Sequence, residues 1–235
     1  MRPLIQVRNL KFRYPDGTLA LDGVDFELNA GETVALLGAN GSGKTTFVLH
    51  LNGLLHGEGD ISICGLVMEK RNIAAIRSRL GLVFQDSDSQ LFMPTVLEDV
   101  AFGPTNLGLS PAEAARRARE ALDKVGMSAA AARPPYHLSA GEKKRVAIAG
   151  ILAMNPDILV LDEPTTFLDP PTQRSLALLL AELPQAKILV THDIPFAQAT
   201  ASRAVFFQNG TILAEGSVSA IATRFGWDFA LEPRP

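Results

Sequence analysis

A glycine-rich run that ends in a lysine and a threonine carries the strongest chemical signal in the sequence. Residues 38–45 read GANGSGKT and fit the whole pattern G-x-x-x-x-G-K-[ST], after an apolar run and before a helical one. Glycines let main-chain N–H groups wrap phosphates, Lys44 can reach the β- and γ-phosphates, and the Thr45 hydroxyl suits Mg²⁺. An ordinary glycine-rich turn is the alternative, and the complete motif in this context argues against it. The predicted nucleotide-binding residues are Gly38, Asn40, Gly41, Ser42, Gly43, Lys44, Thr45 and Thr46.

Two adjacent carboxylates end another apolar run, residues 158–163, which read ILVLDE. Neighbouring side chains on a strand point to opposite faces, so the two acids are predicted to have different tasks. We predict that Asp162 belongs to the Mg²⁺ shell and that Glu163 orients and deprotonates the attacking water. A solvated strand end would also read this way, and the glycine-rich motif upstream favours the catalytic interpretation.

The segment before the glycine-rich motif is predicted to be rich in β-strands. Residues 4–10, 12–14 and 24–28 alternate between apolar and polar side chains, with a turn signal at 15–17. Residues 33–37, TVALL, are apolar without alternation, which is typical of a central strand covered on both faces. This strand is expected to position the phosphate-binding residues.

Strands then alternate with helices, which predicts an α/β fold around a mainly parallel sheet. One helix is expected to start at Ser110, with Pro and Glu in its first turn, and to end at Gly126. A second is expected from Ser139 to just before Asn155. The other expected elements are strands at 158–161 and 188–190, a helix at 175–183, and a two-residue hairpin turn at Asn209-Gly210.

The composition describes a globular chain with a sizeable core and no basic footprint. Of 235 residues 47% are hydrophobic and 20% are charged, and the net charge of −3 does not favour nucleic acid as a partner. The single cysteine allows no internal disulfide. No run approaches the roughly 18 apolar residues of a membrane-spanning helix, so any membrane role is expected to depend on partner chains. The segment after Trp227 is short, has two prolines and is expected at the surface.

Residues 138–142, LSAGE, make the prediction more specific. They resemble the Leu-Ser-Gly-Gly-Gln signature of ABC ATPases and depart from it at Ala140 and Glu142. In that family the signature helix meets the γ-phosphate held by the other cassette, so the resemblance assigns Ser139, Gly141 and Glu142 to nucleotide binding. Ser139 and Glu142 also fit a helix capping box, and both interpretations can hold together.

The resemblance runs from about Tyr14 into the 210s and implies further roles. Gln85 resembles the loop glutamine that contacts Mg²⁺ and senses the nucleotide, and His192 resembles the switch histidine at the γ-phosphate. Tyr14 resembles the aromatic residue that stacks on adenine, with packing as the alternative. Residues 167–169 resemble the dimer-facing loop. The implied cofactors are ATP and Mg²⁺, and Glu163 and His192 are the implied catalytic residues.

The family also implies the architecture of a P-loop NTPase of the ABC ATPase type in a single domain. We expect an antiparallel β lobe, a RecA-like core in two pieces, a helical signature subdomain and a short C-terminal extension. Their expected ranges are 1–32 for the β lobe, 33–84 and 156–215 for the core, 85–155 for the helical subdomain and 216–235 for the extension.

If the signature of one chain closes the ATP site of another, the working unit is a dimer, and we expect a homodimer. Residues 84–92, FQDSDSQLF, resemble energy-coupling-factor ATPases, which serve cobalt, nickel and vitamin uptake. That resemblance implies a transmembrane coupling subunit and a substrate-binding membrane subunit as partners, at the cytoplasmic face of the membrane. Leu91, Phe92 and Met93 are candidates for the docking socket, with a buried corner of the helical lobe as the alternative.

Residues 106–109, NLGL, and the compact C-terminus favour a cobalt or nickel importer, and a vitamin importer such as one for biotin remains close behind. Another ABC importer or an exporter is the second hypothesis. A non-transport ABC protein acting on DNA ends or ribosomes is disfavoured, because the chain has one phosphate-binding motif and no heptad run. An ATP-binding protein without turnover is disfavoured by the presence of Glu163 and His192.

Overall fold

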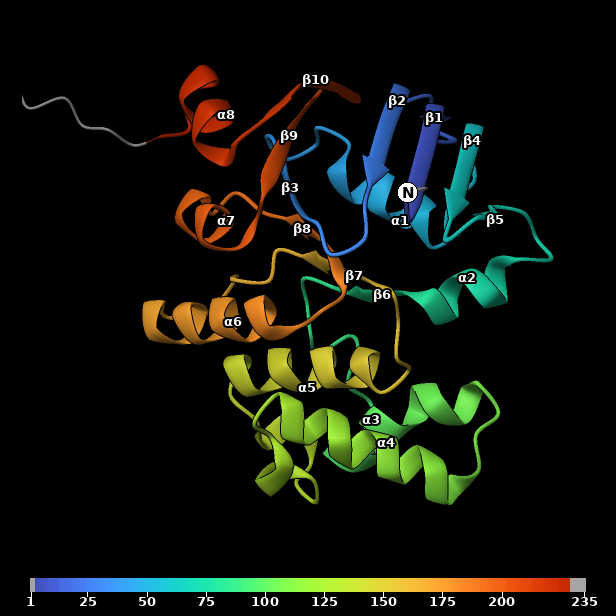
Figure 1. Cartoon of the computed structure of the whole chain (residues 1–235), viewed down its shortest axis with the longest axis vertical. Coiled ribbons are helices and arrows are strands. Elements are labelled where there is room, and N and C mark those ends of the chain that lie inside the picture. Colours follow the sequence, from blue (N-terminus) through green and yellow to red (C-terminus); the bar gives the residue numbers. More distant parts are fainter. Residues whose placement is uncertain (1–2, 229–235) are drawn as a thin grey trace, which may run out of the picture.

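The computed structural model describes residues 3–228. It contains two sheets that lie on either side of helix α1 (Lys44–Leu51; Figure 1). One sheet is antiparallel, in the order β2-β1-β4-β5, and the other has six strands in the order β10-β9-β3-β8-β7-β6. The antiparallel sheet comprises β1 (Ile5–Arg13), β2 (Leu19–Leu28), β4 (Glu58–Ile63) and β5 (Leu66–Val67). The larger sheet comprises β3 (Thr33–Leu37), β6 (Leu80–Val83), β7 (Ile158–Asp162), β8 (Ala186–Val190), β9 (Arg203–Gln208) and β10 (Thr211–Gly216).

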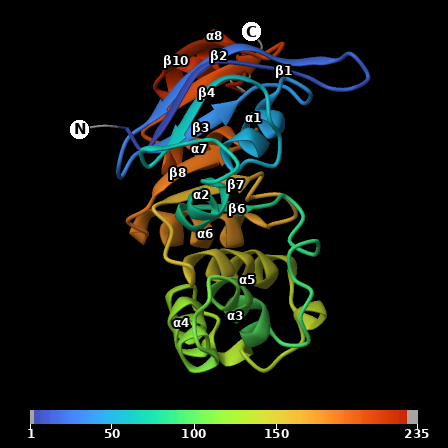
Figure 2. The same cartoon turned by 90° about the vertical axis from the view of Figure 1, so that its right-hand side faces the viewer.

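Helices cover the larger sheet and build a separate layer at the far end of the molecule. They are α1 (Lys44–Leu51), α2 (Ile73–Arg79), α3 (Val96–Asn106), α4 (Pro111–Lys124), α5 (Ala140–Leu152), α6 (Pro170–Glu182), α7 (Ile194–Thr200) and α8 (Val218–Arg224). Two short 3₁₀ turns, Ser128–Ala130 and Pro135–His137, join α4 to α5. In both views α3, α4 and α5 gather at the end opposite the antiparallel sheet (Figures 1 and 2).

The core of the larger sheet is parallel, as predicted. β3 pairs in parallel with β8 and β9, β7 pairs in parallel with β8 and β6, and only the edge strand β10 runs antiparallel to its neighbour. The side chains of β7 alternate between two hydrophobic cores. Ile158 and Val160 pack towards α1 and the antiparallel sheet, whereas Leu159 and Leu161 pack towards the helical layer. Burial on both faces explains the unbroken apolar run.

The antiparallel sheet is larger than the expected range 1–32. β4 and β5 lie within residues 33–84, a range expected to belong to the core, but β4 pairs with β1 through Ile61 opposite Val7 and Ile63 opposite Ile5. That boundary was wrong. The alternating pattern of β4 predicts a strand with one buried face, but nothing local in it says which of two sheets the strand joins.

Three expected helix starts depend on capping, and two were placed correctly. The Ser110 and Ser139 side chains accept hydrogen bonds from the main-chain N–H groups of Glu113 and Glu142. The helix expected from 175 instead begins at Pro170, with Asp169 as its N-cap. Two prolines in the first turn cost no hydrogen bond there, because the first N–H groups of a helix have no partner within the helix.

The predicted hairpin turn is present between β9 and β10, where Asn209 and Gly210 both have positive φ angles, 48° and 77°. The expectation for the segment after Trp227 concerns residues that lie almost wholly outside the described part. Among the helices of residues 3–228, none combines the length and the apolar character needed to cross a membrane.

Candidate active site

The phosphate-binding loop, residues 38–45, joins β3 to α1 and requires glycine at two close contacts. Gly38 has φ 138°, and a Cβ there would lie 2.2 Å from the carbonyl oxygen of Phe207. Gly43 has φ 109°, and its Cβ would lie 2.6 Å from the carbonyl oxygen of Ala20. Because both neighbours are main chain, they cannot move aside like a flexible side chain. The glycines thus serve the packing of the loop as well as its exposed N–H groups.

The Lys44 side chain folds back over this loop. Its Nζ donates to the carbonyl oxygens of Gly38, at 2.6 Å, and Ala39, at 3.0 Å. Burial lowers the Lys44 pKa, while the nearby charges of Glu163 and Asp162 raise it. The ammonium is therefore held at the loop and balanced by the two acids on the opposite wall.

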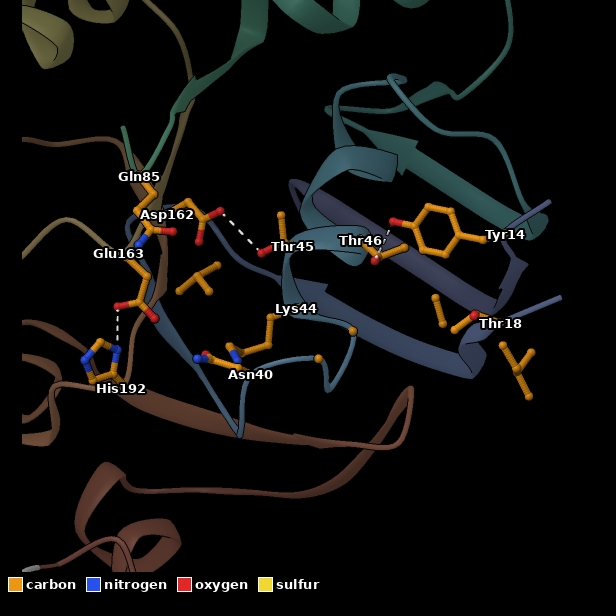
Figure 3. A pocket seen from close by; sticks show the side chains of 15 residues that line it. Tyr14, Thr18, Asn40, Lys44, Thr45, Thr46, Gln85, Asp162, Glu163 and His192 are labelled. Carbon is orange, nitrogen blue, oxygen red and sulfur yellow. Dashed lines mark hydrogen bonds and ion pairs between the residues drawn. The ribbon is translucent and has the colours of Figure 1, made fainter. Parts of the chain in front are cut away.

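Asp162, at the end of β7, faces the start of α1. Its Oδ2 lies 3.4 Å from the Thr45 hydroxyl, and Figure 3 shows the Gln85 side chain on the same side of the cavity. Burial and the adjacent Glu163 raise the Asp162 pKa, and Thr45, Lys44 and Lys144 lower it. A carboxylate, a hydroxyl and an amide oxygen are hard oxygen donors, so this set fits Mg²⁺.

Glu163 turns away from the metal side and meets His192. Glu163 Oε2 lies 2.9 Å from Nδ1 of His192, and the Glu163 side chain is 11% exposed while that of His192 is 67% exposed. Strand alternation alone predicts that the two acids point to opposite faces. In the structure β7 ends at Asp162, and Glu163 adopts φ 44°, so a change of backbone conformation also directs its side chain.

These groups line one cavity of about 490 Å³ (Figure 3). Tyr14 and residues 18–20 form the wall farthest from His192, and the Tyr14 hydroxyl lies 3.0 Å from the Thr46 hydroxyl. Gly38 and Ser42 support the loop without lining the cavity. The predicted site residues that do line it are Tyr14, Asn40, Gly41, Gly43, Lys44, Thr45, Thr46, Gln85, Asp162, Glu163 and His192.

The predicted signature residues do not join this cavity. Ser139, Gly141 and Glu142 line a separate hollow at the start of α5, together with Phe167 and the first turn of α6. The capping box is formed, because Glu142 also accepts a hydrogen bond from the Ser139 main-chain N–H at 2.8 Å. A Cβ on Gly141 would lie 2.7 Å from Thr172 Cγ2, so glycine also permits the close approach of α5 and α6.

The family described as ABC transporter matches residues 21–166 of this chain. The chain belongs to the ABC transporter family. An energy-coupling factor transporter ATP-binding protein, EcfA, of Methanothermobacter thermautotrophicus is 50% identical over 220 residues, 91% of this chain and 71% of the relative. This similarity confirms the expected resemblance to the energy-coupling-factor class.

Solved structures agree with the family and with the ABC ATPase fold. The structure of cbiO1 from Clostridium perfringens, part of the ABC transporter complex cbiONQ, has a TM-score of 0.87 and 35% identity, covering 96% of this chain and 92% of that one. The ATP-binding cassette MJ0796, solved as a dimer in a post-hydrolysis state with ADP and Pi, has a TM-score of 0.81 and 30% identity, covering 91% and 98%. This chain is accordingly an ABC ATPase whose ATP hydrolysis is coupled to transport.

One charged residue of this ABC ATPase was missed by the sequence reasoning. Lys144 on α5 is 3% exposed and donates to the main-chain carbonyls of Phe84 and Gln85. The available signal was the pair Lys143-Lys144 directly after the signature. Neighbouring residues of a helix lie roughly 100° apart, so on a helix with only a narrow exposed face one of the two is expected to turn inward.

Proposed function

We propose that this chain is the ATP-hydrolysing subunit of an energy-coupling-factor importer and that it works as a homodimer. The observation that carries the proposal is the division of its nucleotide-binding groups. The phosphate-binding loop, both acids and His192 line one cavity, whereas the signature residues line another. Each chain therefore carries two half-sites for ATP in separate hollows. In a dimer, the phosphate-binding half-site of one chain meets the signature half-site of the other.

In this proposal the chain's own groups divide the work on ATP. Lys44 and the loop N–H groups hold the phosphates, and Tyr14 lies at the far wall, where the base would stack. Thr45, Asp162 and Gln85 would hold Mg²⁺, which supplies charge neutralisation at the phosphate oxygens. Glu163 accepts the proton of the attacking water, and His192, whose Nδ1 lies 2.9 Å from Glu163 Oε2, contacts the γ-phosphate.

A substitution at Ser139 separates its role in the helix cap from its role at the partner's phosphate. Asp and Asn are both good N-cap residues, so Ser139→Asp and Ser139→Asn should each preserve α5. We expect the aspartate variant to lose at least about tenfold in ATPase activity through like-charge repulsion of the γ-phosphate, the equivalent of about 1.4 kcal/mol. The asparagine variant should lose much less. Phosphate release and thermal unfolding measure the two effects, and equal activity in both variants would contradict the proposal.

Mixing two impaired subunits tests whether the site is shared between chains. Lys44→Ala keeps an intact signature, and Ser139→Asp keeps an intact phosphate-binding loop. A mixed dimer therefore contains one complete site, and random pairing in a symmetric dimer gives about one quarter of the wild-type sites. We expect ATPase activity in the mixture to exceed the sum of the two separate proteins. No gain on mixing would show that each chain uses its own signature residues.

We further propose that the helical layer receives the membrane subunit at an apolar groove. The groove has a volume of about 370 Å³ and is lined by Leu91, Phe92, Phe102 and one side of α5 that includes Gly150 and Ile151, but not by Met93. Phe92 is 62% exposed and meets Phe102 edge to face, with ring centroids 5.0 Å apart. An exposed aromatic pair beside an apolar groove is the kind of feature that anchors a partner helix.

Phe92→Ala should therefore weaken binding of the membrane partner and leave basal hydrolysis of the isolated chain intact. Truncation of an aromatic anchor costs about 2 kcal/mol or more, which is roughly thirtyfold in affinity. Leu213→Ala, at another half-exposed apolar residue on β10, serves as the control. Co-purification with the membrane subunits and ATP hydrolysis are the two readouts. Full assembly and transport with the Phe92 variant would exclude this docking surface.

The proposed cargo is cobalt or nickel, supported by the resemblance of residues 106–109 to such importers. Vitamin import is the second candidate, and the proposed location is the cytoplasmic face of the cell membrane, through the membrane subunits. In cells that carry the whole transporter, Glu163→Gln should abolish accumulation of labelled Co²⁺ or Ni²⁺ and leave biotin uptake unchanged. The opposite pattern would assign the chain to a vitamin importer.

A further inference from the structure

Lys144 is a buried cation that holds the main chain of the loop carrying Gln85. It lies on α5, and its Nζ donates to the carbonyl oxygen of Phe84 at 3.2 Å and to that of Gln85 at 2.9 Å. The loop follows β6, and its other fixed points include Gln90, whose side chain bonds the Phe84 N–H and the Leu82 carbonyl. Lys144 thus connects the signature helix α5 by hydrogen bonds to the main chain at Phe84 and Gln85.

The position of Lys144 costs free energy that packing alone does not require. The side chain is 3% exposed, and burial lowers its pKa, while the charges of Asp162 and Asp86 raise it. An apolar side chain of the same length could fill this space without desolvating an ammonium. The charged donor is explained by the two main-chain carbonyls that it holds, those of Phe84 and Gln85.

The two ends of the contact belong to different ATP sites of the proposed dimer. The Gln85 side chain lines the chain's own cavity beside Asp162. Ser139, the N-cap of α5, is five residues before Lys144, about 7.5 Å along the helix axis at 1.5 Å per residue. Lys144 therefore links the helix whose N-cap is Ser139 to the main chain that carries Gln85.

We propose that Lys144 is a positioning residue that orients Gln85 towards the metal side of the ATP cavity and couples the signature helix to it. This inference rests on the proposed function, in which Gln85 contacts Mg²⁺. The ammonium donates charge-assisted hydrogen bonds to two main-chain carbonyls. By fixing the main chain there, these bonds set the direction of the Gln85 side-chain amide. The alternative is a purely structural bridge between α5 and β6.

The first test compares two charge-removing changes on the same helix. Lys144→Met removes the buried ammonium, and Lys143→Met removes a cation that pairs with the Asp88 carboxylate at 2.6 Å, with the two side chains 19% and 68% exposed. Loss of a supporting contact to a metal ligand typically costs 10- to 100-fold, so Lys144→Met should raise the Mg²⁺ concentration for half-maximal ATPase activity by at least about tenfold. Lys143→Met should shift it less than about threefold, because its partner is a largely exposed carboxylate side chain and it holds no main-chain group of Gln85. Binding of a fluorescent ATP analogue in EDTA should be unchanged in both.

The second test asks whether Lys144 acts through Gln85. Gln85→Ala removes the amide and keeps the carbonyl that Lys144 holds, so it should shift the Mg²⁺ curve by a similar factor. In the Gln85→Ala background, Lys144→Met should add less than about threefold, since two changes on one pathway are not additive. A structural bridge predicts the full additional loss, together with weaker analogue binding in EDTA and a lower unfolding temperature, and that pattern would overturn the inference.

The two proposals fail differently. If Gln85→Ala by itself leaves the Mg²⁺ concentration for half-maximal ATPase activity unchanged, the metal role of Gln85 is wrong, and the inference about Lys144 is wrong as well. If Gln85→Ala shifts the curve and Lys144→Met does not, the metal role stands and only the positioning role of Lys144 is excluded.

Discussion

Glu163→Gln is expected to bind ATP normally and to hydrolyse it at least about 100-fold more slowly, since a positioned general base contributes roughly 10²- to 10⁴-fold. The amide has the size of the carboxylate and can still face His192 Nδ1, which lies 2.9 Å from the present Oε2. It cannot accept a proton from water at neutral pH. With hydrolysis blocked, ATP should hold the dimer closed, because release depends on turnover.

Phosphate release at saturating ATP measures the loss, and size-exclusion chromatography with ATP measures the trapped dimer. Glu182→Gln, at the exposed C-terminal end of α6, makes the same chemical change away from the cavity and should leave both readouts unchanged. Near-normal turnover of the Glu163 variant would remove this residue from the role of base.

Lys44→Ala should lose roughly 10- to 150-fold in affinity for ATP, because hydrogen bonds to charged groups contribute about 1.5–3 kcal/mol. The ammonium lies at the loop, 2.6 Å from the Gly38 carbonyl, where phosphate oxygens are expected. The substitution also removes the cation that offsets the negative charges of Asp162 and Glu163, so the cavity then repels the phosphates of ATP more strongly. Titration with a fluorescent ATP analogue measures the change.

Lys70→Ala is the matched control, since Lys70 is exposed and lies in the turn before α2. Thermal unfolding of both variants separates a loss of binding from a loss of folded protein. Unchanged ATP affinity in a folded Lys44 variant would contradict the assignment of residues 38–45 to phosphate binding.

Features encoded within a few residues could be predicted from the sequence. The spacing of GANGSGKT, the Ser and Glu of the capping box at Ser139, and Asn209-Gly210 each describe a local backbone conformation, and the structure has all three. The apolar runs before Lys44 and Asp162 identified strands buried on both faces. Local hydrogen bonding and period explain this success, because both act over one turn or one strand.

The sequence by itself determined the family, the parallel core and the residue types available for phosphate and metal. Only the tertiary structure decided that β4 joins β1, that Glu163 meets His192, that Lys144 holds the Gln85 main chain, and that Ser139 lies in a different hollow from Lys44. The contacts of β4 and Lys144 and the position of Ser139 relative to Lys44 depend on the packing of segments 50 or more residues apart. The position of the Glu163 side chain depends on the backbone conformation at the end of β7. The physical reason is that side-chain pattern specifies which face of an element is buried, while the packing of all elements together specifies what it is buried against.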